Sequence, residues 1–475
     1  MFTCDLSAPS TPFPHYWEHT VGSGHAPLAL RADWQAQLKR CHEELGFRHV
    51  RFHGILCDDM GTLVDEKDRP VYSFLNADRI VDFLLAIGMK PFVELSFMPT
   101  TLASGRKTVF HYKANVTPPR DYAKWATLIR KLVTHWVDRY GLSEVRQWFF
   151  EVWNEPNLKA FWTGTRADYF RLYRTTAHAI KHIDSRIQVG GPATADNEWI
   201  PEFLAYCSTN SVPVDFVSTH HYPTDAFGKQ GMDTLGELAH TSAGVMREQA
   251  AKVRSQAGSH PLLYTEWNTS SDSRDPLHDQ SFAAAFATRI VMEGHGLADC
   301  YSFWTFSDIF EENYFSSMPF HGGFGLLTLY GIAKPVYRAL EIMHHLGNDL
   351  LPVQGSHRTV NAWAVRSDRE ITILLTNLAM PRHPIARQKV ALQIVGDAER
   401  RGIRIRKIDR TSANPLALWH RMGKPEYLNS RQISKLEHAS IPKESSGKWK
   451  RAGEGLRCTV SLAPQSVAAV TWEFA

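Results

Sequence analysis

Short apolar runs alternate with longer amphipathic stretches from about residue 17 to about residue 347. A short apolar run indicates a buried strand, whereas apolar residues spaced three and four apart predict a helix. The predicted strands are Tyr16–Gly22, His49–Gly54, Lys90–Ser96, Trp148–Trp153, Ile187–Gly191, Asp215–His220, Pro261–Glu266 and Cys300–Thr305. The predicted helices are Asp33–Leu45, Asn76–Ile87, Asp121–Tyr140, Arg166–Ile183, Trp199–Cys207, one within Leu235–Gln256, Ser281–Glu293 and Pro335–His345.

Eight strand–helix units in succession predict parallel strands that are joined by helical crossovers. Because eight such units close into a barrel, we expect an α/β fold built on a (β/α)8 TIM barrel. An open, doubly wound sheet is the alternative. It is disfavoured because no glycine-rich phosphate loop follows the first predicted strand.

The pattern changes after about Leu351, where β-branched runs separated by polar turns predict strands. These runs are Thr359–Val365, Ile371–Leu378, Lys389–Val395, Ile403–Ile408 and Leu456–Trp472. We therefore expect a catalytic barrel over residues 13–347 and an accessory β-sandwich domain over residues 348–475, to which residues 1–12 could add a strand. The basic, polar segment Gln432–Gly455 is expected to be a long surface excursion.

Two of the predicted strands end in the same way, as an apolar run that leads to a glutamate. The fourth leads to Asn154 and Glu155 and stops at Pro156, and the seventh leads to Glu266. Strict alternation would point Asn154 and Glu155 to opposite faces, so both can face one ligand only if the strand end bulges or twists. A lone Asn-Glu-Pro would be read as a solvated turn, but a second rim carboxylate argues for chemistry.

Active sites of parallel barrels lie at the carboxyl ends of the strands. Polar and aromatic residues at those ends are His53, Asn154, Glu155, His220, Tyr222, Glu266 and Trp304, followed by Glu311 and Glu312. Two carboxylates across a barrel mouth suit glycoside hydrolysis, in which one protonates the departing oxygen and the other attacks the sugar or activates water. A retaining enzyme needs them ~5–5.5 Å apart and an inverting enzyme ~6.5–9.5 Å apart.

Composition narrows the class of protein without changing this picture. Hydrophobic residues at 43% and charged residues at 21% are typical of a soluble globular enzyme. The formal net charge of +4 is spread over both signs, and no apolar run approaches the ~20 residues that span a bilayer. We therefore expect neither a nucleic-acid partner nor a membrane partner.

The cysteines and the N-terminus bear on the cellular compartment. Cys4, Cys41, Cys57, Cys207, Cys300 and Cys458 show no paired spacing, which predicts free thiols in a reducing compartment. Residues 1–7 have neither the basic nor the apolar region of a signal peptide. We expect a cytoplasmic protein, or a periplasmic or secreted one where a signal peptide has been removed.

Further motifs surround the strand ends. They are Trp153–Asn157, Val214–Ser218, Thr265–Ser270, Trp304–Asp308, Asn115–Pro119, His321–Gly325, Val21–Gly24 and Trp419–Gly423. Together they closely resemble glycoside hydrolase family 39, and its β-xylosidase branch in particular, over nearly the whole chain. The resemblance implies a retaining exo-β-glycosidase, most closely a β-1,4-xylosidase that releases xylose from the non-reducing ends of xylo-oligosaccharides by double displacement.

By this resemblance Glu155 is the general acid/base and Glu266 the nucleophile, with no metal or other cofactor. Glu155 must begin protonated, and burial and the charge of Glu266 are expected to raise its pKa. Asn154 would hydrogen-bond the sugar 2-hydroxyl group. His220 and Tyr222 resemble the pair that orients the nucleophile and contacts the sugar. Trp304 resembles the floor of the –1 subsite, and His53, Glu311 and Glu312 match positions that bind the terminal sugar.

Alternatives stay open on the same scaffold and outside it. The chain reads Ser270–Arg274 where some family xylosidases have an aromatic residue, which leaves the aglycone preference undecided. Arabinosidase or α-L-iduronidase-like activity is conceivable, although Glu311 and Glu312 are expected to repel a uronic carboxylate. A metal-dependent hydrolase would need clustered histidine and carboxylate ligands. A non-catalytic sugar-binding protein would have no use for both Glu155 and Glu266. The chain could act as a monomer or a homo-oligomer.

Overall fold

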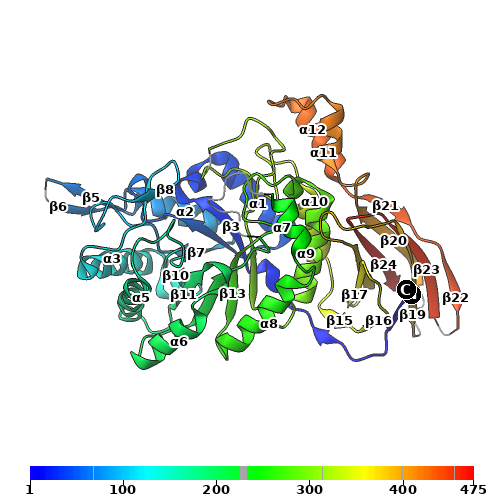
Figure 1. The fold of residues 1–475 in the computed structure, drawn as a ribbon, viewed down its shortest axis with the longest axis horizontal. Coiled ribbons are helices and arrows are strands. Elements are labelled where there is room, and N and C mark those ends of the chain that lie inside the picture. Colours follow the sequence, from blue (N-terminus) through cyan, green and yellow to red (C-terminus); the bar gives the residue numbers. More distant parts are fainter. Residues whose placement is uncertain (68, 225–232, 313, 397–399, 454, 475) are drawn as a thin grey trace.

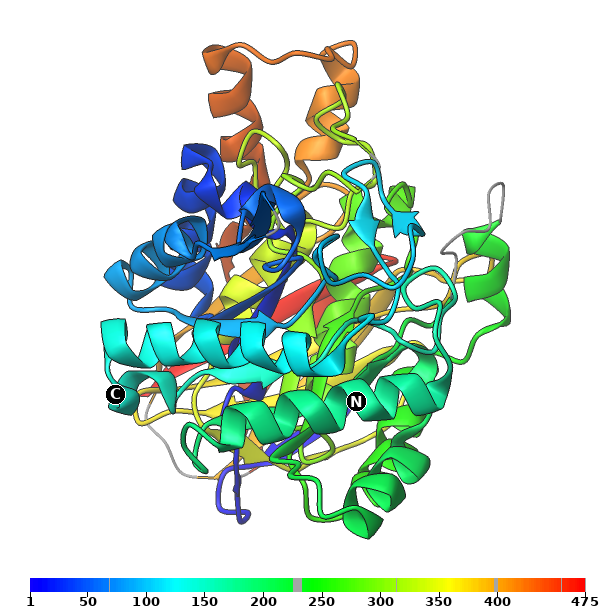
Figure 2. The ribbon, with the colours of Figure 1, turned by 90° about the vertical axis from the view of Figure 1, so that its left-hand side faces the viewer.

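A computed structural model describes residues 1–67, 69–224, 233–312, 314–396, 400–453 and 455–474. Its centre is a closed parallel barrel, flanked by helices in Figures 1 and 2. The barrel strands are β3 (Thr20–His25), β4 (His49–His53), β7 (Lys90–Glu94), β10 (Phe149–Glu151), β11 (Gln188–Thr194), β12 (Phe216–His220), β13 (Leu262–Trp267) and β14 (Cys300–Phe303). The predicted (β/α)8 barrel is confirmed.

The helices follow the strands in the order that the sequence predicts. They are α1 (Ala32–Leu45), α2 (Leu75–Ala86), α3 (Tyr122–Tyr140), α4 (Leu142–Val145), α5 (Arg166–Lys181), α6 (Ile200–Thr209), α7 (Thr234–His240), α8 (Val245–Ala257), α9 (Ser281–Glu293) and α10 (Pro335–His344). Two small hairpins, β5 (Leu63–Glu66) with β6 (Arg69–Tyr72) and β8 (Thr108–Val109) with β9 (Ala114–Asn115), extend the loops above the barrel.

Helix α3 illustrates why the sequence folds in this way. The Asp121 carboxylate caps it by accepting from the backbone N–H groups of Ala123 and Lys124, which typically stabilises a helix by about 1 kcal/mol. Its buried positions, including Trp125, Leu128, Ile129, Leu132, Val133 and Trp136, recur at helical spacing and face the barrel. In Figure 2 α3 (cyan) lies beside α5 (green), with which it is in contact.

Two predictions about the barrel were wrong in detail. The first strand begins at Thr20 rather than Tyr16, because Tyr16–Glu18 form a short 3-10 helix whose aromatic rings are buried in the core. The expected single helix within Leu235–Gln256 is two helices, α7 and α8. The break falls where Thr241 adopts an extended backbone and Gly244 starts the next helix.

Beyond the barrel two further sheets face one another. One has the order β16-β1-β19-β23-β22 and the other the order β2-β15-β17-β18-β24-β20-β21. Their strands are β1 (Phe2–Asp5), β2 (Thr11–Pro12), β15 (Asp349–Leu351), β16 (Val353–Gln354), β17 (Val360–Arg366), β18 (Glu370–Asn377), β19 (Gln388–Val395), β20 (Arg400–Ile408), β21 (Lys443–Ser446), β22 (Trp449–Ala452), β23 (Gly455–Leu462) and β24 (Ser466–Phe474). Residues from both sheets, among them Phe2, Ile373, Leu392 and Trp472, share one hydrophobic core.

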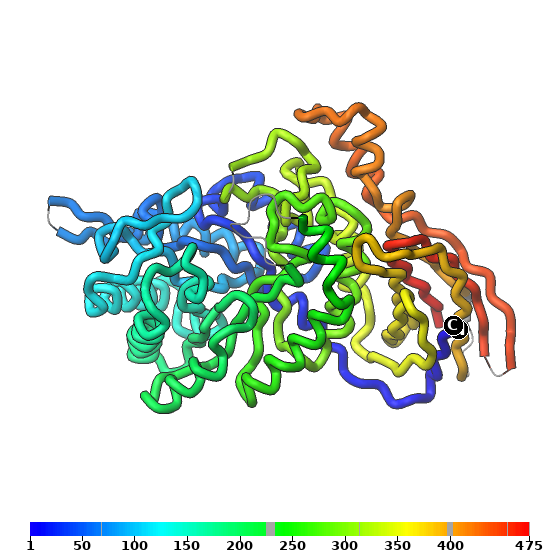
Figure 3. Tube along the Cα trace, in the orientation of Figure 1, coloured from blue at the N-terminus to red at the C-terminus, as the bar shows by residue number. Residues whose placement is uncertain are grey.

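The N-terminal residues belong to these sheets rather than to the barrel. β1 pairs with β19 and β16, and β2 pairs with β15. In Figure 3 the blue N-terminal segment runs from the barrel to the strands of the C-terminal region. Residues 13–347 and 348–475 stay the proposed domains. Helix α10 and strand β15 lie on either side of this proposed boundary.

The larger sheet packs on the barrel through α9. Nearly every residue of α9 is buried, because one side of the helix covers the barrel and the other contacts β18 and β24. Side chains of β18 therefore alternate between two cores, with Ile373 facing the other sheet and Leu374 facing the barrel side. The helix thus joins both parts of the chain into one packed body.

The segment Gln432–Gly455 was predicted to be a surface excursion, and this is only partly correct. Helices α11 (Pro415–Arg421) and α12 (Ser430–Ser440) do project from the molecule in Figure 1. Strands β21 and β22, however, lie at the edges of the two sheets. Their side chains are almost all exposed, so the sequence carries no hydrophobic alternation there.

Candidate active site

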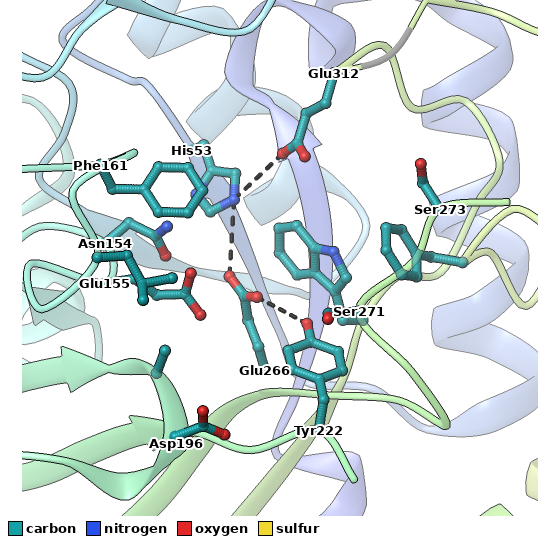
Figure 4. A pocket seen from close by; sticks show the side chains of 14 residues that line it. His53, Asn154, Glu155, Phe161, Asp196, Tyr222, Glu266, Ser271, Ser273 and Glu312 are labelled. Atoms are coloured by element: carbon teal, nitrogen blue, oxygen red, sulfur yellow. Dashed lines mark hydrogen bonds and ion pairs between the residues drawn. The ribbon is translucent and has the colours of Figure 1, made fainter. Parts of the chain in front are cut away.

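One pocket opens at the carboxyl ends of the barrel strands, and Figure 4 shows it from close by. The described residues that line it are His53, Asn154, Glu155, Leu158, Phe161, Ala195, Asp196, Tyr222, Glu266, Ser271, Ser273, Trp304, Glu312 and Phe324. Seven of the nine residues proposed from the sequence are in this group. His220 lies behind it, in contact with Glu155, and Glu311 is not among the described lining residues.

The backbone after β10 explains how two consecutive residues, Asn154 and Glu155, reach the same pocket. Trp153 has a φ of 74° and Glu155 a φ of 42°, both in the left-handed region that L-residues rarely adopt. Such a conformation costs roughly 1–3 kcal/mol at each position and needs support from its surroundings. The Trp153 ring is fully buried and its Nε1–H donates to the Phe161 carbonyl over 2.9 Å, which holds the turn.

The carboxylates of Glu155 and Glu266 face one another across this pocket. An oxygen of each lies within 4.8 Å of the other, and Figure 4 shows the two side chains pointing together. Both are nearly buried, with 7% of Glu155 and 5% of Glu266 exposed. This separation is close to the ~5–5.5 Å of a retaining pair and well below the inverting range.

A buried arginine, Arg51 on β4, organises the carboxylates beneath the pocket. Its Nη1 donates to Glu266 Oε1 over 2.6 Å and its Nε to Glu151 Oε2 over 2.6 Å. Its Nη2 lies 2.7 Å from Glu94 Oε2 and donates to Asn154 Oδ1 over 3.0 Å. Because a guanidinium can only donate, the Asn154 oxygen must face Arg51, and its amide N–H group is the one that is presented to a ligand.

These groups shift one another's pKa. Burial opposes the charge of Arg51, but Glu151, Glu94 and Glu266 outweigh it and raise its pKa. Burial acts to raise the pKa of Glu94, yet His53 and Arg51 lower it below its usual value. For Glu151 burial prevails over the opposing effect of Arg51 and raises the pKa. The Arg51 guanidinium therefore compensates the charge of the buried acidic groups that surround it.

Glu266 receives hydrogen bonds on both carboxylate oxygens. Oε1 accepts from Arg51, and Oε2 accepts from the Tyr222 hydroxyl over 2.9 Å. Burial raises the pKa of Tyr222 well above its usual value, so this hydroxyl stays a donor. Donors on both oxygens stabilise an ionised carboxylate and fix its orientation.

His53 and Glu312 form one side of the pocket. His53 Nδ1 donates to Glu94 Oε2 over 2.6 Å, and its Nε2 lies 3.5 Å from Glu312 Oε1. Burial lowers the pKa of His53, but Glu94, Glu266 and Glu312 outweigh this and raise it. Burial raises the pKa of Glu312 to about 8, so this carboxyl group is protonated at neutral pH.

A bulge in β13 brings Thr265 and Glu266 to the barrel interior together. Thr219 of β12 pairs with Tyr264, and the next residue, His220, pairs with Glu266, so Thr265 is an extra residue in the ladder. His220 Nε2 lies 3.1 Å from Thr265 Oγ1, and His220 Nδ1 lies 2.9 Å from Glu155 Oε1. Burial lowers the pKa of His220 well below its usual value, and Arg51 and His53 act in the same direction.

Trp304 supplies the flat apolar surface of the pocket. Its ring centroid lies 4.8 Å from that of His53, and its indole packs edge-on against Phe310. Gly22 on β3 makes room for it, because a Cβ atom at this position would lie 2.6 Å from Trp304 Cε3. The indole is therefore held in one position by its neighbours.

Glu311 turns away from the pocket lining and binds His25. His25 Nδ1 donates to Glu311 Oε1 over 2.8 Å, while His25 Nε2 faces Asp59 Oδ2 at 3.3 Å. Burial opposes the charge of His25, but Asp59, Cys57 and Glu311 raise its pKa to about 11. Glu311 thus anchors the loop that carries Glu312.

The sequence analysis missed the residues behind the pocket: Arg51, Glu94, Glu151 and Thr265. A signal existed, because Arg51, Glu94 and Glu151 are charged residues within otherwise apolar strands. A charge buried in a strand must be paired, so three such residues on neighbouring strands predict one ion-pair cluster. Thr265 carries no such signal, since its inward direction depends on the bulge.

Three groups of described residues have the ligand atoms for a metal ion. They are Glu155 with His220 and Glu266, His25 with Cys57 and Asp59, and His15 with Glu18 and His344. In the first group Arg51 and Tyr222 already donate to the two oxygens of Glu266. A positive guanidinium bonded to a ligand oxygen disfavours a cation there, so the pocket fits acid–base and nucleophilic chemistry better.

Comparison with known proteins agrees with this arrangement. The family model of the glycosyl hydrolases family 39 matches residues 3–455. A beta-xylosidase of Caldicellulosiruptor saccharolyticus is 47% identical over 462 residues, which are 96% of this chain and 95% of that protein. A beta-xylosidase of Geobacillus stearothermophilus is 40% identical over 440 residues, which are 90% and 86% of the two chains.

A solved structure extends the comparison to three dimensions. The crystal structure of a monomeric beta-xylosidase from Caulobacter crescentus CB15 has a TM-score of 0.86 and 32% identity, with 99% of each chain covered. The match includes both the barrel and the β-rich C-terminal region. The chain belongs to glycosyl hydrolases family 39 and is a glycoside hydrolase.

Proposed function

We propose that the protein is a retaining exo-β-xylosidase that releases xylose from the non-reducing ends of xylo-oligosaccharides. The observation that carries the proposal is the approach of the Glu155 and Glu266 carboxylates to within 4.8 Å across a buried pocket. The relatives that bear the name beta-xylosidase support xylose as the sugar.

In the first step Glu266 attacks the anomeric carbon and Glu155 gives its proton to the departing glycosidic oxygen. The new bond joins one Glu266 oxygen to the sugar as the bond to the aglycone breaks. Arg51 and Tyr222 hold the nucleophile in place, and the amide N–H group of Asn154 reaches the 2-hydroxyl group, a contact that strengthens in the transition state.

In the second step a water molecule attacks the same carbon from the side that the aglycone has left. Glu155, now a carboxylate, takes a proton from this water, and the bond to Glu266 breaks. The product keeps the configuration of the substrate because the carbon is inverted twice. Both catalytic glutamates return to their starting states.

The enclosure and charge of the pocket support a single neutral sugar as the group that is bound. His53, Asn154 and Trp304 are each less than 4% exposed, so the sugar end of the pocket is enclosed. The expected repulsion of a uronic carboxylate by Glu311 and Glu312 was wrong for neutral pH, because Glu311 binds His25 and Glu312 is protonated below about pH 8. Among the described lining residues, however, no lysine or arginine is present to pair with a uronic carboxylate.

Replacement of the nucleophile tests the proposal. Glu266→Ala should lower kcat on an aryl β-xyloside by at least ~10⁴-fold. Added azide should restore turnover, and the product should be the α-glycosyl azide, with inverted configuration. Chromatography and NMR of the product measure both outcomes. Glu155→Ala should affect substrates with poor leaving groups most, because good ones need little acid assistance.

A matched control distinguishes the loss of the nucleophile from the loss of a glutamate elsewhere in the chain. Glu43→Ala, on the exposed face of α1, should keep wild-type activity, since 58% of its side chain is exposed and it lies outside the barrel mouth. Wild-type turnover by Glu266→Ala without azide would contradict the assignment of the nucleophile. Higher activity on α-L-iduronides or arabinosides than on β-xylosides in a panel of nitrophenyl glycosides would contradict xylose as the sugar.

The cysteines support a proposed site of action in the cytoplasm. All six are free and buried. Free thiols without disulfides are usual in reducing compartments. None of the described helices is long and apolar enough to cross a membrane.

A further inference from the structure

Four side chains form one continuous row of hydrogen bonds that ends at Glu155. Glu151 Oε1 accepts from the Thr265 hydroxyl over 2.8 Å, Thr265 Oγ1 lies 3.1 Å from His220 Nε2, and His220 Nδ1 lies 2.9 Å from Glu155 Oε1. Glu151, Thr265 and His220 are completely buried, so water cannot substitute for a missing partner. The direction of each hydrogen bond therefore follows from counting protons.

The Thr265 hydroxyl has a single proton and gives it to Glu151. Burial raises the pKa of Glu151, but its other oxygen accepts from the charged Arg51 guanidinium over 2.6 Å, and this contact holds Glu151 as a carboxylate that accepts on both oxygens. The Thr265 oxygen then has only lone pairs to offer His220. His220 Nε2 must carry the proton of that bond.

His220 is neutral, because it is fully buried and faces the cations Arg51 and His53. A neutral imidazole with its proton on Nε2 has a bare lone pair on Nδ1. The 2.9 Å contact with Glu155 Oε1 is then a hydrogen bond only if Glu155 supplies the proton.

We propose that Glu151 and Thr265 are positioning residues that, through the tautomer of His220, hold a proton on Glu155 in the resting enzyme. This inference rests on the proposed role of Glu155 as general acid/base. It assigns a task to two buried residues that touch neither the sugar nor the reacting atoms. The bulge at Thr265 is what turns its hydroxyl inward beside Glu266.

The same arrangement serves both halves of the reaction. When Glu155 gives its proton to the departing oxygen, its new carboxylate oxygen faces the lone pair of His220 Nδ1. The repulsion between these two lone pairs favours return of the proton, which comes from the attacking water as the glycosyl–Glu266 bond breaks. The charged or titratable groups around this row are Arg51 and His53 on β4, Glu94 on β7, Glu151 on β10, Tyr222 after β12, Glu266 on β13, and Asp196 and Glu312 at the pocket.

The tautomer of His220 can be measured without any substrate. Imidazole ¹⁵N shifts of histidine-labelled enzyme distinguish a protonated Nε2 from a protonated Nδ1, and His220→Gln identifies the signals by their loss. We expect the wild type to show a protonated Nε2 and an unprotonated Nδ1 at neutral pH. A proton on Nδ1, or on both nitrogens, would overturn the proposal even if the enzyme hydrolyses xylosides.

Thr265→Val tests the consequence for catalysis, with Thr265→Ser as its matched control. Valine has the same shape without the hydroxyl, so His220 is free to change tautomer and donate to an ionised Glu155. For a substrate with a poor leaving group, we expect the alkaline limb of the profile of kcat/KM against pH to move about one pH unit lower. At a given pH on this limb, kcat/KM then falls about tenfold. Serine keeps the hydroxyl and should restore the wild-type limb.

The outcomes separate this proposal from the proposed function. If Thr265→Val lost activity equally at every pH and its alkaline limb did not move, Thr265 would have a purely structural role. This result would overturn the proposed role of Thr265 in holding the proton on Glu155. An enzyme that shows the predicted tautomer but no turnover of β-xylosides would instead contradict the proposed substrate. Thermal unfolding of each variant identifies any that fails to fold, and the His220 measurement on the wild type still decides the question.

Discussion

Carboxyl groups within one pocket differ in charge state because their immediate partners differ. Glu266 accepts from Arg51 and Tyr222, and Glu94 has its pKa lowered by His53 and Arg51. Glu312 has no comparable donor, since its Oε1 is buried without a hydrogen bond and burial raises its pKa to about 8. The roles of these acids therefore follow from single contacts rather than from their position at the barrel mouth.

The raised pKa of Glu312 predicts a pH-dependent difference in stability. Between about pH 4.5 and pH 8 the folded chain keeps a proton on Glu312 that the unfolded chain has lost, so the free energy of unfolding falls as pH rises through this window. Glu312→Gln stays neutral and avoids this loss. We expect the melting temperature of the variant relative to the wild type to rise by a few degrees from pH 5 to pH 9.

Thermal melts across this pH range provide the measurement. Glu43→Gln on α1, whose side chain is 58% exposed, is the control and should follow the wild type throughout. If the difference between Glu312→Gln and the wild type is constant over the range, Glu312 does not carry the proton.

At this scale the sequence identifies residues at the carboxyl ends of strands better than residues in the middles of strands. Glu155 and Glu266 could be predicted because each ends an apolar run, where a carboxylate has no structural reason to be. The contact of Arg51 with Glu266 and the inward direction of Thr265 could not be placed, because the first joins strands that are not neighbours and the second depends on a one-residue bulge. The direction of Glu311 was equally hidden, since it is set by His25, far away in the sequence.

At the scale of elements, close approach of neighbouring strands shapes the pocket. β3 runs beside β14, and Gly22 of β3 lies against Trp304, which follows β14. The phenyl ring of Phe310 is placed in the same way, because a Cβ at Gly24 would lie 2.8 Å from it. Two glycines on one strand therefore leave room for these two aromatic rings.

Gly22→Ala tests this arrangement. The added methyl group would lie 2.6 Å from Trp304 Cε3, so the indole, which we propose lies under the sugar, must move. We expect KM for an aryl β-xyloside to rise about tenfold or more, with a smaller change in kcat, because stacking contributes mainly to binding. Steady-state kinetics and tryptophan fluorescence measure the effect.

Gly402→Ala, on β20, is the matched control. No described atom lies within 4 Å of a Cβ at Gly402, so its kinetics should equal those of the wild type. An unchanged KM in Gly22→Ala would show that the indole can shift without affecting the sugar.

Strand and helix order were predictable because hydrophobic periodicity is strong in a barrel whose strands are buried. The errors fall where other forces dominate. Tyr16 and Trp17 are apolar because they fill the core under a 3-10 turn, so they resemble strand residues. Lys443 and Trp449 lie in exposed edge strands, which backbone pairing holds without an apolar face.

At the scale of the whole molecule, the chain begins in the sheets that it ends in. Phe2 and Cys4 of β1 are buried between strands from residues beyond 348, while the intervening chain builds the barrel. α9 packs against both the barrel and the larger sheet. Unfolding of the sheets therefore exposes one side of a barrel helix.

Phe2→Ala tests this connection. Removal of a buried phenyl group should lower the free energy of unfolding by about 3 kcal/mol, while kcat at low temperature stays unchanged because the pocket is remote. Because α9 couples the two parts, heat inactivation of xyloside hydrolysis should shift to lower temperature together with the unfolding transition. Calorimetry and residual activity after heating provide the two curves.

Tyr427→Ala should match the wild type, since 74% of Tyr427 is exposed. If Phe2→Ala produced a separate early transition that left activity intact, the sheets and the barrel would unfold independently. One shared transition supports their coupling through α9.

The contacts of Arg51 restrict how this enzyme can be engineered. Its side chain bonds to groups on three other barrel strands and to Asn154. A substitution at any one of these positions therefore disturbs the contacts of the others. Libraries that vary one of them alone should yield mostly dead variants, whereas new specificities are to be sought in Ser271, Ser273 and Asp196 at the rim, which Arg51 does not hold.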